Sequence, residues 1–199
     1  CIVSINLDEF FEIRVSGIKE QIRIGSRKSG EDGIAPADLL ERVSDEVHEI
    51  ISEQYSLLND DILPALEKEG VIFLRRSLWT EAQRDWIHSY FMREVMPVLT
   101  PIGLDPAHPF PFIPNTGFSL ALELERETDH RTLKALLPIP QQIARFVRLP
   151  GKEGEYRFLP LEELLLLHLD MLFPGYTDRG QCLFRVLRDS DLEVEDEAE

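Results

Sequence analysis

The protein has 199 residues, of which 37 are Asp or Glu and 21 are Lys or Arg, and its formal net charge is −16. This length suits one medium domain or two small ones, and a hydrophobic content of 43% is sufficient for a packed core. So negative a chain is a poor starting point for binding DNA, RNA or another anionic polymer.

The rest of the composition favours a cytosolic protein. The two cysteines, Cys1 and Cys182, are too few for a disulfide scaffold, and no closely spaced Cys/His set predicts zinc. The longest apolar run, residues 164–167, is far shorter than a membrane span, and residues 1–5 lack the basic leader of a signal peptide. Because the chain opens on Cys1 without an initiator Met, we interpret it as a fragment.

Residues 7–24 form the first predicted helix. Asn6 is a suitable N-cap because its side-chain oxygen can accept from the free N–H groups of the first turn, and Glu9 completes a capping box. Asp8, Glu9 and Glu12 match the positive end of the helix dipole. Apolar residues recur at spacings of three and four, which predicts one buried face: Leu7, Phe10, Phe11, Val15, Ile18 and Ile22.

A polar, glycine-rich connection follows at residues 25–33. Arg23, Arg27 and Lys28 form a small basic cluster beside it. The cluster fits a solvated loop at a helix C-terminus, where cations are favoured, and it also fits a contact with an anion.

The second predicted helix starts near Pro36 and keeps helical apolar spacing to Glu69. Pro64 removes a backbone donor and clashes one turn back, so we expect a kink or break between Leu58 and Pro64. Gly70 is placed to end the helix in the left-handed conformation.

Strands are expected after Gly70. Residues 71–74 read as a short strand, and Thr80 with Gln83 predicts a capping box at the start of a helix over 80–95. The proline-rich residues 97–114 predict an ordered, extended crossing, with Phe110, Phe112 and Ile113 as apolar anchors.

The remaining residues predict a β-rich region with one apolar helix. The first two strands are expected to pair as an antiparallel hairpin, and the helix is apolar nearly all round, so we expect it to be buried between layers or in an interface. The expected strands are 117–126, 133–139, 145–149, 156–159 and 182–187, and the helix spans 160–173.

The predicted fold class is therefore α+β. An N-terminal helical domain with two long antiparallel helices is expected over residues 1–70. An α+β head domain with a mainly antiparallel sheet is expected over 71–192, followed by an acidic linker over 193–199.

The sequence contains no phosphate-binding glycine loop and no nucleophile motif, so we predict no catalytic residue in this chain. We also predict no metal site. Asp105 and His108 could present two metal ligands, but a third is missing. The alternative for His108 is a polar partner within a packed turn.

Two stretches resemble a known family. Residues 2–14 (IVSINLDEFFEIR) resemble a signature of the N-terminal helical domain of the class-1 polyphosphate kinases. Residues 97–112 (PVLTPIGLDPAHPFPF) resemble a stretch of that family's head domain. The remaining pattern, up to about Leu192, fits the same family.

The resemblance implies an enzyme that moves the terminal phosphoryl group of ATP reversibly to polyphosphate through a phosphohistidine. In that family the catalytic histidines, the groups that bind Mg²⁺ and most contacts to ATP, ADP and polyphosphate belong to two C-terminal domains that this chain lacks. The fragment alone is therefore expected to be inactive.

For this chain the resemblance assigns one site residue. The asparagine of the family signature contacts ATP near the adenine, which implies that role for Asn6; an aromatic residue that helps to hold the base would precede Cys1. The family's head domain also takes part in subunit association, so a homo-oligomer is implied, with the helix over 160–173 suited to an interface. The implied location is cytoplasmic, with peripheral association at the inner membrane as a further option.

A second hypothesis comes from a different class. The missing active site and the acidic tail also fit a stand-alone interaction module with no nucleotide role. In that case Asn6 is an N-cap and nothing more.

Overall fold

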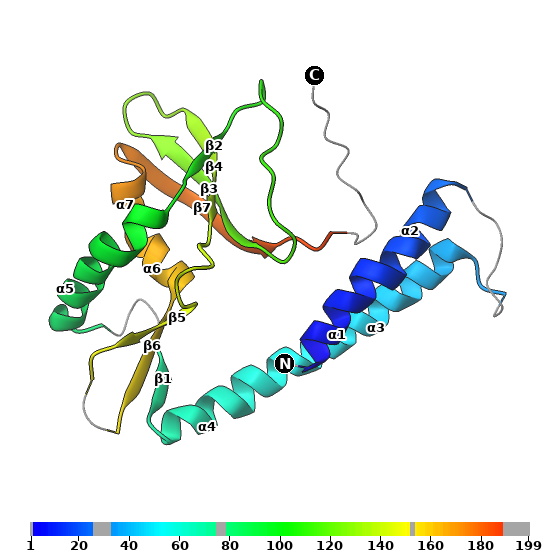
Figure 1. The fold of residues 1–199 in the computed structure, drawn as a ribbon, viewed down its shortest axis with the longest axis horizontal. Helices are drawn as coiled ribbons and strands as arrows, with labels where there is room; N and C mark the ends of the chain where they lie inside the picture. The colour runs from blue at the N-terminus through cyan, green and yellow to red at the C-terminus, as the bar shows by residue number, and fades with distance from the viewer. Residues whose placement is uncertain (1, 26–32, 75–78, 152–153, 189–199) are drawn as a thin grey trace. The chain divides into compact units, whose positions relative to one another are not determined.

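The computed structural model describes residues 2–25, 33–74, 79–151 and 154–188 (Figure 1). The chain folds into two compact units: residues up to Asn59 together with those from Leu187 onward form the first, and Asp60 to Val186 form the second. Long helices make up the first unit, and the second combines helices with antiparallel strands, so the predicted α+β class is confirmed.

The first unit is a pair of helical rods that lie side by side (Figure 1). Val15 and Val47 are buried between them, with 1% and 7% of their surface exposed. The first rod consists of α1 (Ile2–Phe10), the π-helical turn η1 (Phe11–Val15) and α2 (Ser16–Arg23), and the second begins with α3 (Pro36–Ser56).

The predicted N-cap at Asn6 is wrong. Helix α1 is already formed at Ile2, so Asn6 lies in its second turn and its capping box with Glu9 does not form. A tertiary contact accounts for the difference: the Gln54 Nε2 of α3 donates a hydrogen bond of 2.9 Å to the Ser4 Oγ, which holds the first turn against the neighbouring rod. Local capping preference cannot register such a partner fifty residues away.

A kink or break was predicted between Leu58 and Pro64, and the chain instead stays helical through this stretch and changes helix type. Between α3 and α4 (Leu63–Lys68) the helix widens into a π-helical turn, η2 (Leu57–Ile62), directly before Pro64. The wider turn accommodates the missing proline N–H and the bulk of its ring. Gly70 ends the rod with a φ of +80°, as predicted.

The second unit contains two sheets. The four-stranded sheet has the order β2-β4-β3-β7 and is antiparallel throughout. The three-stranded sheet has the order β1-β6-β5, in which β1 runs parallel to β6 and β5 runs antiparallel to it. The strands are β1 (Val71–Phe73), β2 (Ile102–Leu104), β3 (Phe118–Arg126), β4 (Thr132–Pro138), β5 (Phe146–Leu149), β6 (Tyr156–Pro160) and β7 (Tyr176–Arg185).

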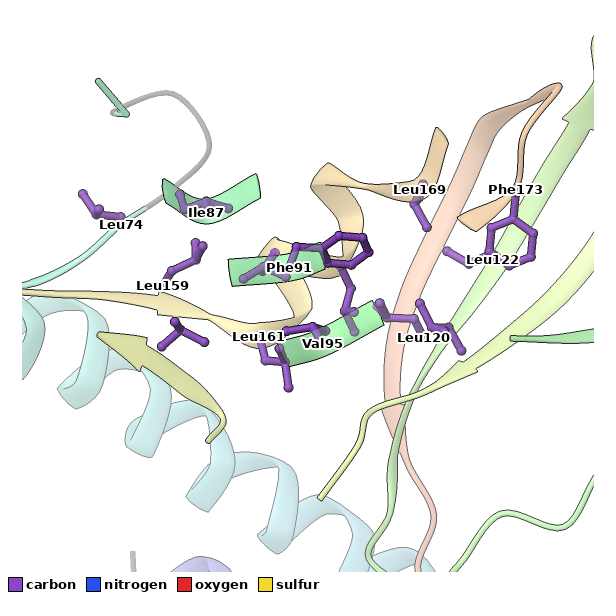
Figure 2. Close-up of a cluster of buried hydrophobic side chains, with 14 of the residues drawn as sticks. Leu74, Ile87, Phe91, Val95, Leu120, Leu122, Leu159, Leu161, Leu169 and Phe173 are labelled. Carbon is purple, nitrogen blue, oxygen red and sulfur yellow. The ribbon is translucent and has the colours of Figure 1, made fainter. Parts of the chain in front are cut away.

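Helices fill the space between these strands and complete the core. Figure 2 shows Phe91 and Val95 gathered with Leu161 and Leu120, which come from a second helix and from the four-stranded sheet. The predicted helix over 160–173 is buried here as expected, but it breaks at His168. The helices are α5 (Glu81–Tyr90), the π-helical η4 (Phe91–Val95), the 3₁₀ turn η5 (Met96–Val98), α6 (Leu161–Leu167) and α7 (Leu169–Leu172).

The proline-rich segment differs from its prediction. Ile113 is buried at 4% exposure, but Phe110 and Phe112 keep 66% and 67% of their surface exposed. Successive side chains of an extended segment point to opposite sides, so the two phenylalanines share the side away from Ile113. One anchor is confirmed and two are wrong.

The predicted capping box on α5 is present and can be tested. The Gln83 N donates to the Thr80 Oγ1 at 3.3 Å, and the Thr80 N donates to the Gln83 Oε1 at 3.0 Å. Thr80→Ala should lower the free energy of unfolding by about 1 kcal/mol, because orphan N–H groups of the first turn lose their acceptor. Urea denaturation measures this loss. Thr177→Ala, on an exposed edge strand, is the matched control, and an equal loss there would contradict the capping role.

Candidate functional site

Asn6 lies in the interior of α1 with its side chain exposed to solvent. Within the described residues its amide makes no hydrogen bond to the protein. An asparagine amide offers two N–H donors and one acceptor oxygen, so it can pair with the edge of a heteroaromatic ring. Since Asn6 is not a cap, all of this capacity is available to a ligand.

The helix around Asn6 departs from regular geometry. The π-helical η1 begins five residues after Asn6, and π-helical turns inside α-helices occur frequently at functional sites. A groove of about 560 Å³ is lined mainly by η1 and α2, from Phe11 to Arg23. Asn6 is not among the residues that line it, so the structure does not bring the predicted site residue and this groove together.

The basic cluster predicted beside α2 is only partly described. Arg23 donates from Nε and Nη2 to the two carboxylate oxygens of Glu20, at 2.7 and 2.8 Å. Hydrogen bonds from Arg23 hold the pKa of the Glu20 carboxyl below its usual value. An anion that bound Arg23 would therefore compete with Glu20. Arg27 and Lys28 lie outside the described residues.

Three exposed histidines, His48, His108 and His130, lie apart from one another, and each has a local partner. The Nδ1 of His48 lies 2.7 Å from the Ser44 carbonyl, and that of His130 lies 2.8 Å from the Glu125 carboxylate. The Nδ1 of His108 is 3.3 Å from Asp105 in an exposed turn, where the Ala107 N also donates to Asp105. Across residues 2–25, 33–74, 79–151 and 154–188 there is no group of three His, Cys, Asp or Glu side chains that could hold a metal ion.

Sequence reasoning gave no special place to His168, which the structure buries in the core at 4% exposure. Because its neighbours in sequence are leucines, their periodicity predicts a continuous helix and hides the break at this residue.

In the described part of the chain, no helix is long and apolar enough to cross a membrane.

Comparison with known families decides the identity. The sequence-family model of the polyphosphate kinase N-terminal domain matches residues 1–74. The sequence-family model of the polyphosphate kinase middle domain matches residues 82–199. The chain belongs to the polyphosphate kinase family.

Individual relatives agree with this assignment. The chain is 41% identical to the polyphosphate kinase of Pseudomonas aeruginosa over 201 residues, and 41% identical to that of Neisseria meningitidis over 202 residues. It matches the crystal structure of the polyphosphate kinase of Porphyromonas gingivalis with a TM-score of 0.77 and 30% identity over 98% of its own length. The chain spans 29% of the length of the two relatives and 28% of the solved chain.

Proposed function

We propose that the chain is the N-terminal and head part of a polyphosphate kinase. That enzyme transfers the terminal phosphoryl group of ATP to a histidine and from there to polyphosphate, releasing ADP and a polymer longer by one phosphate, and it runs reversibly. The observation that carries the proposal is that the chain matches both polyphosphate kinase domain families in chain order. A relative named polyphosphate kinase, 41% identical to the chain, supports it.

Within this enzyme Asn6 contacts ATP near the adenine. Three features of the Asn6 side chain support this role: it is exposed, it makes no hydrogen bond within the described residues, and it does not cap a helix. The contact between Ser4 and Gln54 fixes the helix turn that carries it. A helical position held from the neighbouring rod presents the amide with less loss of conformational entropy than a loop would.

The phosphohistidine and the Mg²⁺ ligands belong to domains outside these residues. Among the described residues, no three carboxylate, imidazole or thiol groups converge on one point. In the whole enzyme phosphoryl transfer rests on positioning and charge neutralisation, and this chain contributes the orientation of the nucleotide.

Each proposed domain of the chain has its own role in the enzyme. Residues 1–70 form the helical domain that carries Asn6, residues 71–192 form the head domain that supports homo-oligomer assembly, and residues 193–199 lead towards the catalytic domains. Its proposed location is the cytoplasm, and peripheral association at the inner membrane is a further option. The alternative is an interaction module without a nucleotide role.

Replacement of Asn6 tests the nucleotide role. In an enzyme that contains the catalytic domains, Asn6→Ala should raise the KM for ATP about fivefold, which corresponds to one lost hydrogen bond of about 1 kcal/mol. The KM for polyphosphate should be unchanged, because the polymer is bound elsewhere. Steady-state kinetics with ATP varied at saturating polyphosphate measures the first effect, and kinetics with polyphosphate varied at saturating ATP measures the second.

Gln21→Ala is the matched control, since Gln21 carries the same amide on the exposed surface of α2, about 22 Å along the rod. An unchanged KM for ATP in Asn6→Ala would remove the nucleotide role. The chain by itself is expected to show no kinase activity. If activity also failed to appear after the catalytic domains were joined to it, the interaction module would be favoured.

A further inference from the structure

His168 occupies an unusual position for an ionisable side chain. It stands at the break between α6 and α7 and is buried in the apolar core of the second unit, with 4% of its surface exposed. Its ring stacks on Phe91 of η4 with a centroid distance of 4.0 Å and an angle of 5° between the planes. The ring of His88, which α5 carries on its exposed side, lies 5.5 Å away at 28°.

The hydrogen bonds of His168 suit its neutral form. The Nδ1 lies 2.9 Å from the Leu164 carbonyl oxygen and donates to it, because a carbonyl only accepts. The proton of the neutral ring is therefore on Nδ1. Protonation would add an N–H at Nε2, and no acceptor for Nε2 is found among the described residues.

Charged groups reach this ring from two elements. His88 approaches from α5, and Asp170 from the first turn of α7, whereas η4 contributes the Phe91 ring and α6 the Leu164 carbonyl. Burial, and secondarily the proximity of His88, lower the pKa of His168, while the Leu164 carbonyl and Asp170 act in the opposite direction. The Phe91 face also favours a cation, but the net direction of the shift shows that the cost of burying the charge outweighs this attraction.

The backbone of His168 takes part in the first turn of α7. The His168 carbonyl accepts from the N–H groups of Met171 and Leu172, so the first turn of α7 is built on the histidine itself. Phe173 then leads through a turn at Gly175 into β7, the edge strand of the four-stranded sheet. We therefore expect a movement of His168 to displace α7 and the residues at the start of β7.

We propose that His168 makes the α6–α7 corner a proton-sensitive latch: the neutral ring, stacked on Phe91 and bonded to Leu164, holds the corner closed against α5 and η4, and protonation opens it. The inference goes beyond the proposed function and does not depend on it. When the corner opens, the ring reaches water and regains its ordinary pKa of 6.5. The open state therefore binds the proton more tightly than the closed state.

The direction of the pH effect follows from linkage. Because the closed-state pKa is the lower one, the latch has its full strength above about pH 6.5 and loses strength as the pH falls towards the closed-state pKa. The opening equilibrium constant rises by up to tenfold for each pH unit in this window.

Amide hydrogen exchange followed by mass spectrometry tests the latch. After correction for the intrinsic rate, exchange across residues 161–173 should be faster at pH 5.5 than at pH 7.5, by up to about tenfold. His168→Phe keeps an aromatic ring on Phe91 but cannot titrate, so the same segment should lose this pH dependence. His130→Gln, which removes an exposed histidine, is the control and should behave as wild type.

Two results would overturn the proposal: a wild-type segment whose corrected exchange is the same at both pH values, or a His168→Phe protein that retains the wild-type change. If the variant fails to fold, NMR titration of the wild-type His168 ring decides alone. A pKa below 6.5 with Nδ1 protonated supports the latch, and a pKa at or above 6.5 removes it.

Discussion

Phe91→Ala should destabilise the second unit by about 3–5 kcal/mol, the range measured for removing a fully buried aromatic ring. Phe91 has no exposed surface and lies in the main core among side chains from both helices and sheets (Figure 2). The substitution removes its apolar contacts, opens a cavity and also takes away the face on which the His168 ring stacks. Urea denaturation monitored by circular dichroism measures the loss.

Met92→Ala provides the matched control for this prediction. Met92 is the next residue of η4 but keeps 40% of its surface exposed, so its truncation should cost less than about 1 kcal/mol. Losses of similar size in the two variants would mean that the core is not centred on Phe91.

Gly70→Ala should lower the free energy of unfolding by about 2–4 kcal/mol. Gly70 has a φ of +80°, where an L-residue with a Cβ is strained by about 1–2 kcal/mol. A Cβ at this position would also lie 2.7 Å from the backbone oxygen of Gly154, and that contact can be relieved only by shifting the backbone. The Tyr156 N donates to the Gly70 oxygen at 2.8 Å, so the shift would disturb the start of β6.

Gly175→Ala separates the two contributions. Gly175 has nearly the same φ, +78°, but a Cβ there meets no atom within 4 Å. Its replacement should therefore show the conformational strain alone, about 1–2 kcal/mol. If thermal or urea denaturation gave both variants the same loss, the close approach of Gly70 to Gly154 would have no energetic weight.

Residue patterns predicted most of the elements, because their signals are local. The capping box at Thr80 and the terminal glycine at Gly70 each depend on the chemistry of a few neighbouring residues, and the structure shows both. Near Pro64 the structure has a π-helical turn in place of the predicted kink or break. The antiparallel hairpin of β3 and β4 was predicted for the same reason, since strand alternation is visible over a short window. The last strand was predicted too short, because β7 gains its first residues by pairing with β3.

The errors occurred where a distant partner decides the outcome. Helix α1 extends four residues before Asn6, where Ser4 bonds to a glutamine from the other rod. Phe110 and Phe112 look like core residues in sequence, but the direction of the extended segment points both of them outward. The helix also breaks at His168, which stacks on Phe91 from another helix, although histidine is not a helix-breaking residue type.

The sequence by itself determined the family and the kind of most elements. A long signature and regular apolar periodicities can be recognised in the sequence alone, because they reflect the local preferences of the backbone and the burial of one face. The candidate site residue, Asn6, also came from the signature. Only the tertiary structure decided that Asn6 is an exposed side chain inside a helix and that His168 is buried against Phe91. Exposure, stacking and pKa depend on the groups that folding brings together, and the order of residues along the chain does not specify those groups.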